Sequence, residues 1–354
     1  MGSKFSGKNP PELLVDQFSR TISYLRLSIT DRCNLRCIYC QPKKIEETVP
    51  HWKSVEILQH RDLLTYEELL HFASVAVSMG MDKIRLTGGE PLVRRGILNF
   101  IRSLNNLEGL KQIRLTTNGV LLPELAEPLF QAGIRHLNIS LDTLKPEKFA
   151  RITGRDLFHT VWQGIQIAKN LGFQVKLNVV AMRGINDDEF RDFAHLALQE
   201  PLQVRFIEFM PVGEQAGWDK KDFISASEIQ SLIMQEGTLT PQKGQRSEGP
   251  ARVFSLTDRE GRQGSVGFIS PISHHFCDSC NRLRLTSEGR LRSCLLSDQE
   301  TDIREILRSG GTDDDLRSAI RLTIMTKKKG HAMQEGPDSI AQAPCHGRMS
   351  RIGG

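Results

Sequence analysis

Residues 25–40 read LRLSITDRCNLRCIYC, so a strand-like apolar run leads directly into three cysteines. At 25–29, leucine and isoleucine alternate with polar residues, which is typical of a β-strand. Similar aliphatic or β-branched runs follow at 83–86, 112–116, 136–141, 175–180 and 204–209. Amphipathic helical patterns separate them, among them 66–79, 97–104, 124–131, 161–171 and 189–198. Six strands that alternate with helices predict a parallel sheet of repeated βα units.

The number of these units indicates an open barrel. Right-handed crossovers curl βα units around a common axis, and a complete eight-unit barrel takes about 250 residues. The alternating part of this chain is shorter, so we expect an α/β fold, a partial (β/α)6 TIM-like barrel with a C-terminal extension. The expected domains are an N-terminal extension at 1–23, the barrel at 24–237 and a C-terminal region at 238–354.

The alternation of strand-like and helical patterns ends after residue 237. Residues 241–265 are rich in Gly, Pro, Gln and Arg, and a hairpin is expected around 287–289. A helix should begin at Thr312, and the lysines at 327–329 would form its solvated end. The polar segment 43–64 would be an insertion or a lid. Cys345 lies in an irregular stretch and is expected to be an incidental thiol.

Composition excludes several classes of protein. The chain has 354 residues, 39% of them hydrophobic and 25% charged, which is typical of a folded globular protein. No apolar run approaches the roughly 20 residues of a membrane span, and the N-terminus resembles neither a signal nor a transit peptide. We therefore expect no membrane association and a cytoplasmic location. A net charge of +5 and 6% aromatic residues do not favour a nucleic-acid-binding surface.

The first cysteine group, Cys33, Cys37 and Cys40, follows the first strand. Parallel barrels place their chemistry at the C-terminal ends of their strands. Three thiolates can hold three corners of a [4Fe–4S] cubane, which normally takes four cysteines, and so leave one iron open. A zinc site with a remote fourth ligand is the alternative, and the spacing alone leaves both interpretations open.

The second group, Cys277, Cys280 and Cys294, again supplies three thiolates. Structural zinc is the alternative here too, with His274, His275 or Cys345 as the fourth ligand. Arg282 and Arg284 lie between these cysteines, and their spacing puts both on one face of a strand. Two guanidiniums on one face suit a polyphosphate, although surface arginines more often pair with carboxylates.

Charged residues also interrupt the barrel strands. Arg26, Arg85 and Lys176 lie within apolar runs, and a buried charge needs an anionic partner. Either carboxylates or a triphosphate at the barrel mouth would meet this need.

Two motifs together resemble a known superfamily. The C-x3-C-x2-C spacing with Tyr39 before the third cysteine, and Gly88-Gly89-Glu90-Pro91 after the second strand, resemble the radical S-adenosylmethionine (SAM) enzymes. The second cysteine group with its Asn-Arg-Leu-Arg and the Gly-Gly C-terminus resemble one family among them, the GTP 3′,8-cyclases of molybdenum cofactor biosynthesis.

The resemblance implies a role for each matching residue. Cys33, Cys37 and Cys40 would hold the catalytic [4Fe–4S] cluster, and Cys277, Cys280 and Cys294 a second one. The residues implied to contact SAM are Tyr39, Gly89, Ser140 and Met210. Those implied to contact GTP are Arg26, Arg85, Thr116, Lys176, Arg282, Leu283, Arg284, Gly353 and Gly354.

The implied reaction converts GTP to (8S)-3′,8-cyclo-7,8-dihydroguanosine 5′-triphosphate by means of a 5′-deoxyadenosyl radical. The implied cofactors are two [4Fe–4S] clusters and SAM. The implied partners are an external low-potential electron donor and the next enzyme of the pathway, cyclic pyranopterin monophosphate synthase. A homodimer is left open. The alternatives are another radical SAM enzyme with an auxiliary cluster, acting on peptide or RNA, and a non-catalytic zinc-binding module.

Overall fold

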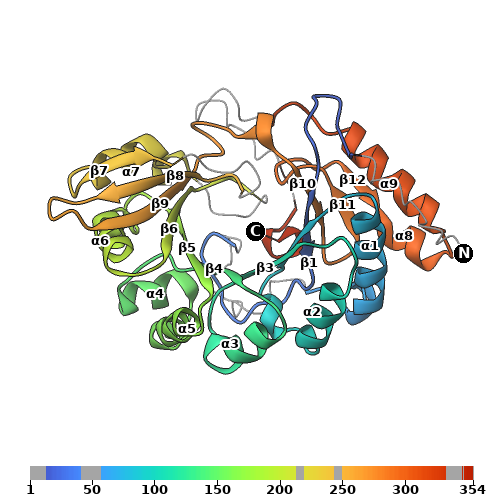
Figure 1. The fold of residues 1–354 in the computed structure, drawn as a ribbon, viewed down its shortest axis with the longest axis horizontal. Helices are drawn as coiled ribbons and strands as arrows, with labels where there is room; N and C mark the ends of the chain where they lie inside the picture. The colour runs from blue at the N-terminus through green and yellow to red at the C-terminus, as the bar shows by residue number, and fades with distance from the viewer. Residues whose placement is uncertain are drawn as a thin grey trace, which may run out of the picture.

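A computed structural model describes residues 13–40, 57–212, 219–242, 249–331, 345 and 347–353. All six expected strands are present, each within one residue of its predicted bounds. They are β1 Tyr24–Ser28, β2 Lys83–Thr87, β3 Gln112–Thr117, β4 His136–Ser140, β5 Gln174–Ala181 and β6 Gln203–Glu208. They pair in parallel and in chain order. The predicted partial barrel is confirmed (Figure 1).

Helices cover the outer face of the barrel (Figure 1). They are α1 Tyr66–Ser78, α2 Ile97–Asn105, α3 Leu122–Gln131, α4 Pro146–Thr153, α5 Phe158–Asn170 and α6 Phe190–Gln199. The first begins with a capping box, in which Thr65 and Glu68 satisfy each other's backbone N–H groups. Their apolar faces and those of the strands form one core cluster, which includes Phe72, Phe149 and Phe206.

The C-terminal part of the chain extends this sheet at both edges. On the β6 edge, β9 Gln263–Ile269 pairs in parallel, followed by β8 Arg252–Thr257 and β7 Thr238–Pro241. On the β1 edge, β10 Arg282–Leu285 pairs in parallel, followed by β11 Arg290–Arg292 and β12 Glu300–Asp302. Within the described residues the result is a sheet of twelve strands, in which β10, the strand between Cys280 and Cys294, pairs with β1, the strand that leads into the first cysteine group.

Further helices follow β6 and complete this part of the fold. They are α7 Ala226–Ile233, α8 Ile303–Arg308, α9 Asp313–Met325 and α10 Met349–Ile352. As predicted, Thr312 caps α9 and β10 and β11 form the expected hairpin. The solvated lysine end is wrong for Lys327, whose exposed fraction is only 2%. Among the described helices, none has the length and apolar character that crossing a membrane requires.

The chain's last described residues lie inside the barrel (Figure 1). Arg284 donates a hydrogen bond from Nη1 to the carbonyl oxygen of Gly353, at 2.7 Å. Cys345, expected to be incidental, is fully buried and its sulfur lies 3.4 Å from a guanidinium nitrogen of Arg292. The segment 43–56, most of the proposed insertion or lid, and Gly354 lie outside the described residues.

Candidate active site

A cavity of about 300 Å³ lies inside the barrel, and its lining runs from Tyr24 at the start of β1 to the residues that follow the C-terminal ends of the strands. All six cysteines of the two groups line it, although more than 230 positions separate Cys40 from Cys277. The other predicted site residues in the lining are Arg26, Tyr39, Arg85, Gly89, Thr116, Ser140, Met210, Arg282 and Arg284. The parallel sheet brings them together because neighbouring strands present inward-facing residues such as Arg26, Arg85 and Arg284 to one barrel interior, while Cys33, Cys37 and Cys40 follow the end of β1.

The first cysteine group lies on a loop that α4 holds in place. The backbone N–H groups of Arg36 and Ile38 donate to the carbonyls of Thr153 and Ile152, at 2.8 and 3.0 Å. Burial raises the pKa of the Cys33 thiol to about 11 and that of Cys40 to about 12. Buried thiols of this kind become stable thiolates when a metal centre supplies positive charge. The donor set therefore fits a [4Fe–4S] cluster.

The arrangement of the cysteines also bears on the zinc alternative. In the described part of the chain, no three His, Cys, Asp or Glu side chains converge closely enough to bind a single metal ion. A cubane does not require this convergence, because each thiolate binds a different iron. The spacing of the donors is therefore compatible with a cluster at both cysteine groups.

The Gly88-Gly89 turn packs directly against the first cysteine loop. The Gly89 N–H donates to the carbonyl of Thr30 at 2.7 Å. A Cβ atom at Gly89 would lie 2.4 Å from the carbonyl oxygen of Arg32, so no larger residue fits there. Glu90 then accepts hydrogen bonds from the Asn118 N–H and the Thr117 hydroxyl, which tie the turn to β3.

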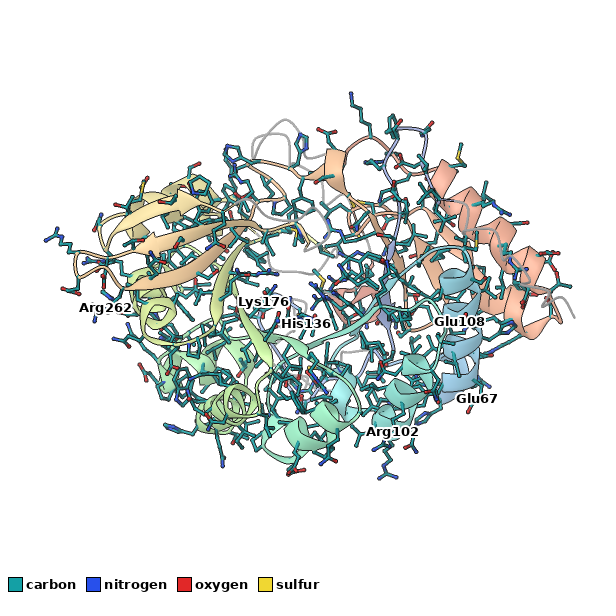
Figure 2. The ribbon with its side chains drawn as sticks, viewed as in Figure 1. Glu67, Arg102, Glu108, His136, Lys176 and Arg262 are labelled. Carbon is teal, nitrogen blue, oxygen red and sulfur yellow. The ribbon has the colours of Figure 1, made fainter. Side chains whose placement is uncertain are left out.

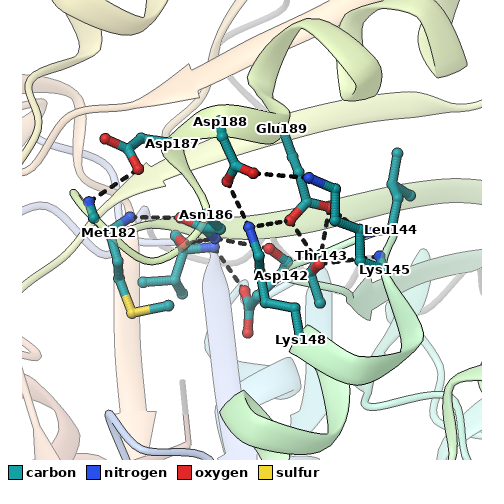
Figure 3. A network of polar contacts seen from close by, with 12 residues as sticks. Asp142, Thr143, Leu144, Lys145, Lys148, Met182, Asn186, Asp187, Asp188 and Glu189 are labelled. Atoms are coloured by element: carbon teal, nitrogen blue, oxygen red, sulfur yellow. Dashed lines mark hydrogen bonds and ion pairs between the residues drawn. The ribbon is translucent and has the colours of Figure 1, made fainter.

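A polar network supports the part of the cavity that Tyr39 and Ser140 line. The Tyr39 hydroxyl donates to Asp142 at 2.7 Å, and Asp142 also accepts the Val180 N–H at 2.8 Å. Asn186 donates to the carbonyls of Asp142 and Val180, at 2.7 and 2.9 Å (Figure 3). The sequence analysis missed Asp142, although its place just past the end of a parallel strand is the signal that marks functional residues.

Five guanidiniums line the cavity between the two cysteine groups: Arg26, Arg85, Arg205, Arg282 and Arg284. The sequence analysis missed Arg205, although it is a charged residue in a buried strand just as Arg26 is. Among the described residues of the lining, Glu208 is the one carboxylate, and its oxygens accept the N–H groups of Ala226 and Ile272. The cavity therefore carries an excess of positive charge.

This crowding of cations shifts their pKa values. Burial, together with the charge of Arg282, lowers the pKa of Arg284 to about 10. Burial and the charge of Arg284 also hold the pKa of Arg26 well below its usual range. Arg85 donates to the Tyr24 hydroxyl at 2.5 Å and to the Thr116 hydroxyl at 3.2 Å. A polyanion in the cavity would relieve the mutual repulsion of these groups.

Three other predicted GTP contacts lie apart from the lining. Lys176 lies on the inner face of the sheet, two residues before Asn178, which does line the cavity (Figure 2). The Leu283 side chain is fully buried in the core, so any contact with a ligand there would come from its backbone. Gly353 contacts Arg284 beside the cavity.

The second cysteine group lies near the start of β1 and the first follows its end, since Cys280 comes two residues before Arg282, which pairs with Tyr24, the first residue of β1. Burial alone would raise the pKa of Cys280, but the charges of Arg282 and Lys327 outweigh it and lower this pKa to about 6. A thiol with this pKa is a thiolate at neutral pH, as a cluster ligand must be. The proposed fourth zinc ligands His274, His275 and Cys345 do not belong to the cavity lining, which contains His331 instead.

This fold and this pair of cysteine groups define a radical SAM enzyme with a second cluster region. Residues 27–197 match the model of the radical SAM superfamily, and residues 202–333 match that of the Molybdenum Cofactor Synthesis C domain. The chain belongs to the GTP 3′,8-cyclase family. It is therefore an enzyme, and its cofactors are SAM and two [4Fe–4S] clusters.

Two curated relatives carry this assignment. The chain is 49% identical to the GTP 3′,8-cyclase of Thermodesulfovibrio yellowstonii over 324 residues, covering 91% of this chain and 97% of the relative. It is 44% identical to the GTP 3′,8-cyclase of Heliobacterium modesticaldum over 344 residues, covering 96% of this chain and 100% of the relative. This family membership excludes a non-catalytic zinc module.

Among solved structures, the chain resembles Streptococcus suis SuiB. In its complex with the precursor peptide SuiA, the TM-score is 0.60 at 14% sequence identity, covering 92% of this chain and 76% of that chain. With S-adenosylmethionine bound, the TM-score is 0.59 at 13% identity, covering 92% and 77%. At this identity the likeness establishes the fold alone.

Proposed function

We propose that this chain converts GTP to (8S)-3′,8-cyclo-7,8-dihydroguanosine 5′-triphosphate for molybdenum cofactor biosynthesis. The observation that carries the proposal is the group of five guanidiniums between the two cysteine groups. Each charge-assisted hydrogen bond to phosphate contributes about 1.5–3 kcal/mol. A triphosphate supplies enough anionic oxygens to engage several of these guanidiniums at once.

The residues divide into four groups by role. Cys33, Cys37 and Cys40 hold the first cluster, and Tyr39, Gly89, Ser140 and Met210 contact SAM beside it. Cys277, Cys280 and Cys294 hold the second cluster. The residues that bind GTP are Arg26, Arg85, Thr116, Lys176, Arg282, Leu283, Arg284, Gly353 and Gly354.

Bound together, the first cluster and SAM supply the 5′-deoxyadenosyl radical, which takes a hydrogen atom from C3′ of GTP before C3′ bonds to C8 of guanine. The chain's own residues position the two partners of this reaction. The guanidiniums anchor the triphosphate in the interior of the barrel, where Arg26 and Arg85 lie within β1 and β2 and Arg282 and Arg284 within β10, beside the second cysteine group. The ribose would then lie between SAM and the base, as hydrogen transfer from C3′ requires.

A peptide or RNA substrate is the competing proposal for a radical SAM enzyme with a second cluster. The excess of positive charge in the cavity favours a small polyanion over a neutral peptide. Proteins that bind single-stranded RNA combine a basic groove that follows the backbone with aromatic side chains that stack on successive bases. Among the described lining residues, the aromatic ones are Tyr24, Tyr39, Phe209 and Phe276.

The remaining assignments are part of the same proposal. An external low-potential donor would supply the electrons, and cyclic pyranopterin monophosphate synthase would take the product. We place the enzyme in the cytoplasm and divide it at 1–23, 24–237 and 238–354, with a homodimer as a further option.

The direct test is an anaerobic incubation of the cluster-loaded enzyme with SAM and a reductant, with and without GTP. We expect 5′-deoxyadenosine and the cyclised nucleotide only when GTP is present. GTP deuterated at C3′ tests whether C3′ is the position attacked, because the deuterium should then appear in the 5′-deoxyadenosine. Formation of 5′-deoxyadenosine at equal rates with and without GTP would overturn the proposal.

A further inference from the structure

Lys327 is buried directly behind the second cysteine group. Its exposed fraction is 2%, and its Nζ donates to the carbonyl of Arg282 at 3.2 Å and to the carbonyl of Ser293. Arg282 follows Cys280 by two residues, and Ser293 immediately precedes Cys294. One ammonium group therefore joins the two backbone segments that carry Cys280 and Cys294.

In the part of the chain that the structure describes, no carboxylate forms an ion pair with Lys327, and its ammonium group donates to two backbone carbonyls. A buried ammonium group is costly without an anion nearby. The carbonyls that it contacts lie on the segments that carry Cys280 and Cys294, and a cluster held by these cysteines would bring negative charge to this place. The second cluster would then supply the counter-charge of Lys327.

Arg20 also contacts the backbone beside the second cysteine group. Its Nη1 donates to the carbonyls of Cys277 and Lys329, at 2.8 and 3.0 Å, and its Nη2 donates to the carbonyl of Lys328 at 2.7 Å. Its Nε is held by Asp16 at 2.6 Å, and both side chains are buried. Arg20 therefore ties the remaining cysteine to the segment that carries Lys327.

We propose that Lys327 and Arg20 are positioning residues for the second cluster, and that the charge of Lys327 makes this cluster easier to reduce. This inference rests on the proposed assignment of Cys277, Cys280 and Cys294 to that cluster. The reduction potential of an iron–sulfur cluster depends on the charge and hydrogen bonds around it. A fixed positive charge stabilises the reduced form, which carries one more negative charge, more than the oxidised form.

The experiment uses the full chain with Cys33, Cys37 and Cys40 replaced by serine, so that the second cluster gives the only iron signal. Each variant is reconstituted anaerobically, its iron is counted, and its midpoint potential is measured by a redox titration followed by electron paramagnetic resonance. In this background we compare Lys327→Met, Lys327→Gln and Lys327→Arg. Lys328→Met is the matched control, because the Lys328 side chain is exposed while its carbonyl contact to Arg20 is a backbone one.

We expect about four irons in the parent protein, as one cubane requires. Lys327→Met and Lys327→Gln should disfavour reduction at least tenfold, which is a shift of about 59 mV to lower potential for one electron. Lys327→Arg should restore most of the potential, and Lys328→Met should leave it unchanged. Gln retains a hydrogen-bond donor without the charge, so a shift in both neutral variants assigns the effect to the charge.

The potentials and iron contents of the variants can also overturn the proposal. Unchanged potentials in both neutral variants with full iron content overturn the proposal. Loss of the cluster in both neutral variants but not in Lys327→Arg supports it, whereas loss in Lys327→Arg as well overturns it in favour of a role in packing. Absence of iron from the parent protein would instead contradict the assignment of the second cluster itself.

Discussion

The Tyr39 hydroxyl lies 2.7 Å from Oδ2 of Asp142 and joins the first cysteine loop to the chain segment just past β4. These two residues are more than 100 positions apart in the chain. The Val180 N–H occupies the other carboxylate oxygen of Asp142, so one side chain connects three segments around the proposed SAM position. This contact explains why an aromatic residue with a hydroxyl group suits position 39.

Loss of this hydroxyl should weaken SAM binding. We expect Tyr39→Phe to raise the Kd for SAM about 5–30-fold, because a hydrogen bond to a carboxylate contributes about 1–2 kcal/mol. Isothermal titration of the cluster-loaded protein measures this change. Tyr66→Phe is the control, since the Tyr66 hydroxyl contacts the Arg94 carbonyl instead. Equal affinities in the Tyr39→Phe variant and the parent would show that the contact does not support the site.

Tyr24 should ionise at an unusually low pH. Burial opposes this, but the positive charges of Arg85 and Arg26 outweigh it and lower the pKa of Tyr24 to about 8. The chain has three tyrosines, and burial raises the pKa of Tyr39 and that of Tyr66, the latter to about 12. An ultraviolet titration of the cluster-free protein should therefore show one ionisation separate from the others.

The low pKa of Tyr24 also makes the free energy of unfolding depend on pH. The pKa of Tyr24 is lower in the folded protein than in the unfolded chain, where it is about 10. Its contribution to stability is complete above that value and is lost as the pH falls through about 8. Arg85→Met should move the ionisation to higher pH. A titration in which all three tyrosines ionise together above about pH 10 would contradict the prediction.

Arg282→Ala and Arg284→Ala should weaken GTP binding while SAM binding survives. Each loses a guanidinium that lines the cavity, and a charge-assisted hydrogen bond of about 1.5–3 kcal/mol corresponds to about 10–100-fold in Kd. Equilibrium binding of both ligands to the cluster-loaded variants tests this. The control is Arg290→Ala, because Arg290 forms an ion pair with Asp302 on the next strand. Unchanged GTP affinity in both test variants would rule out the phosphate-binding role.

Two neighbouring carboxylates allow a matched test of the network behind the site (Figure 3). Glu189 and Asp188 both form ion pairs with Lys148, but the side chain of Glu189 is fully buried and that of Asp188 is 54% exposed. Glu189 also accepts the Thr143 hydroxyl and the Leu144 N–H.

Glu189→Ala should therefore lower the free energy of unfolding by about 3 kcal/mol, since it leaves buried donors without an acceptor. Asp188→Ala should cost less than about 1 kcal/mol, because water screens the exposed pair. Urea denaturation of the cluster-free variants compares the two. Similar losses in both would show that burial does not determine the strength of these contacts.

The barrel strands were predictable because their residues alternate strongly and lie next to amphipathic helices. The hairpin of β8 and β9 was not, since much of β8 remains partly exposed and the polar composition conceals the alternation. In β9, a Cβ atom at Gly264 would lie 2.4 Å from the carbonyl of Ala197. That glycine therefore permits a close contact between β9 and α6, which no local pattern reveals.

Within the site, the cysteines and the charged residues of the strands could be predicted as functional residues. Their spacing or their place in an apolar strand calls for a metal centre or an anionic partner. Asp142 and Arg205 carried the same kinds of signal but were overlooked. Lys327 could not be distinguished from Lys328 and Lys329 by composition. Only the path of the chain after α9 turns one of these three side chains inward.

The sequence by itself determined the parallel barrel, the two incomplete cysteine groups and the resemblance to GTP 3′,8-cyclases, because periodicity and ligand spacing are local properties of the chain. The tertiary structure alone decided that β10 pairs with β1 and so brings the two cysteine groups to one cavity. It also decided which cations surround that cavity and which one is buried behind the second group. Such contacts depend on strand pairing between distant segments, and the pairing is selected by the packing of the whole core.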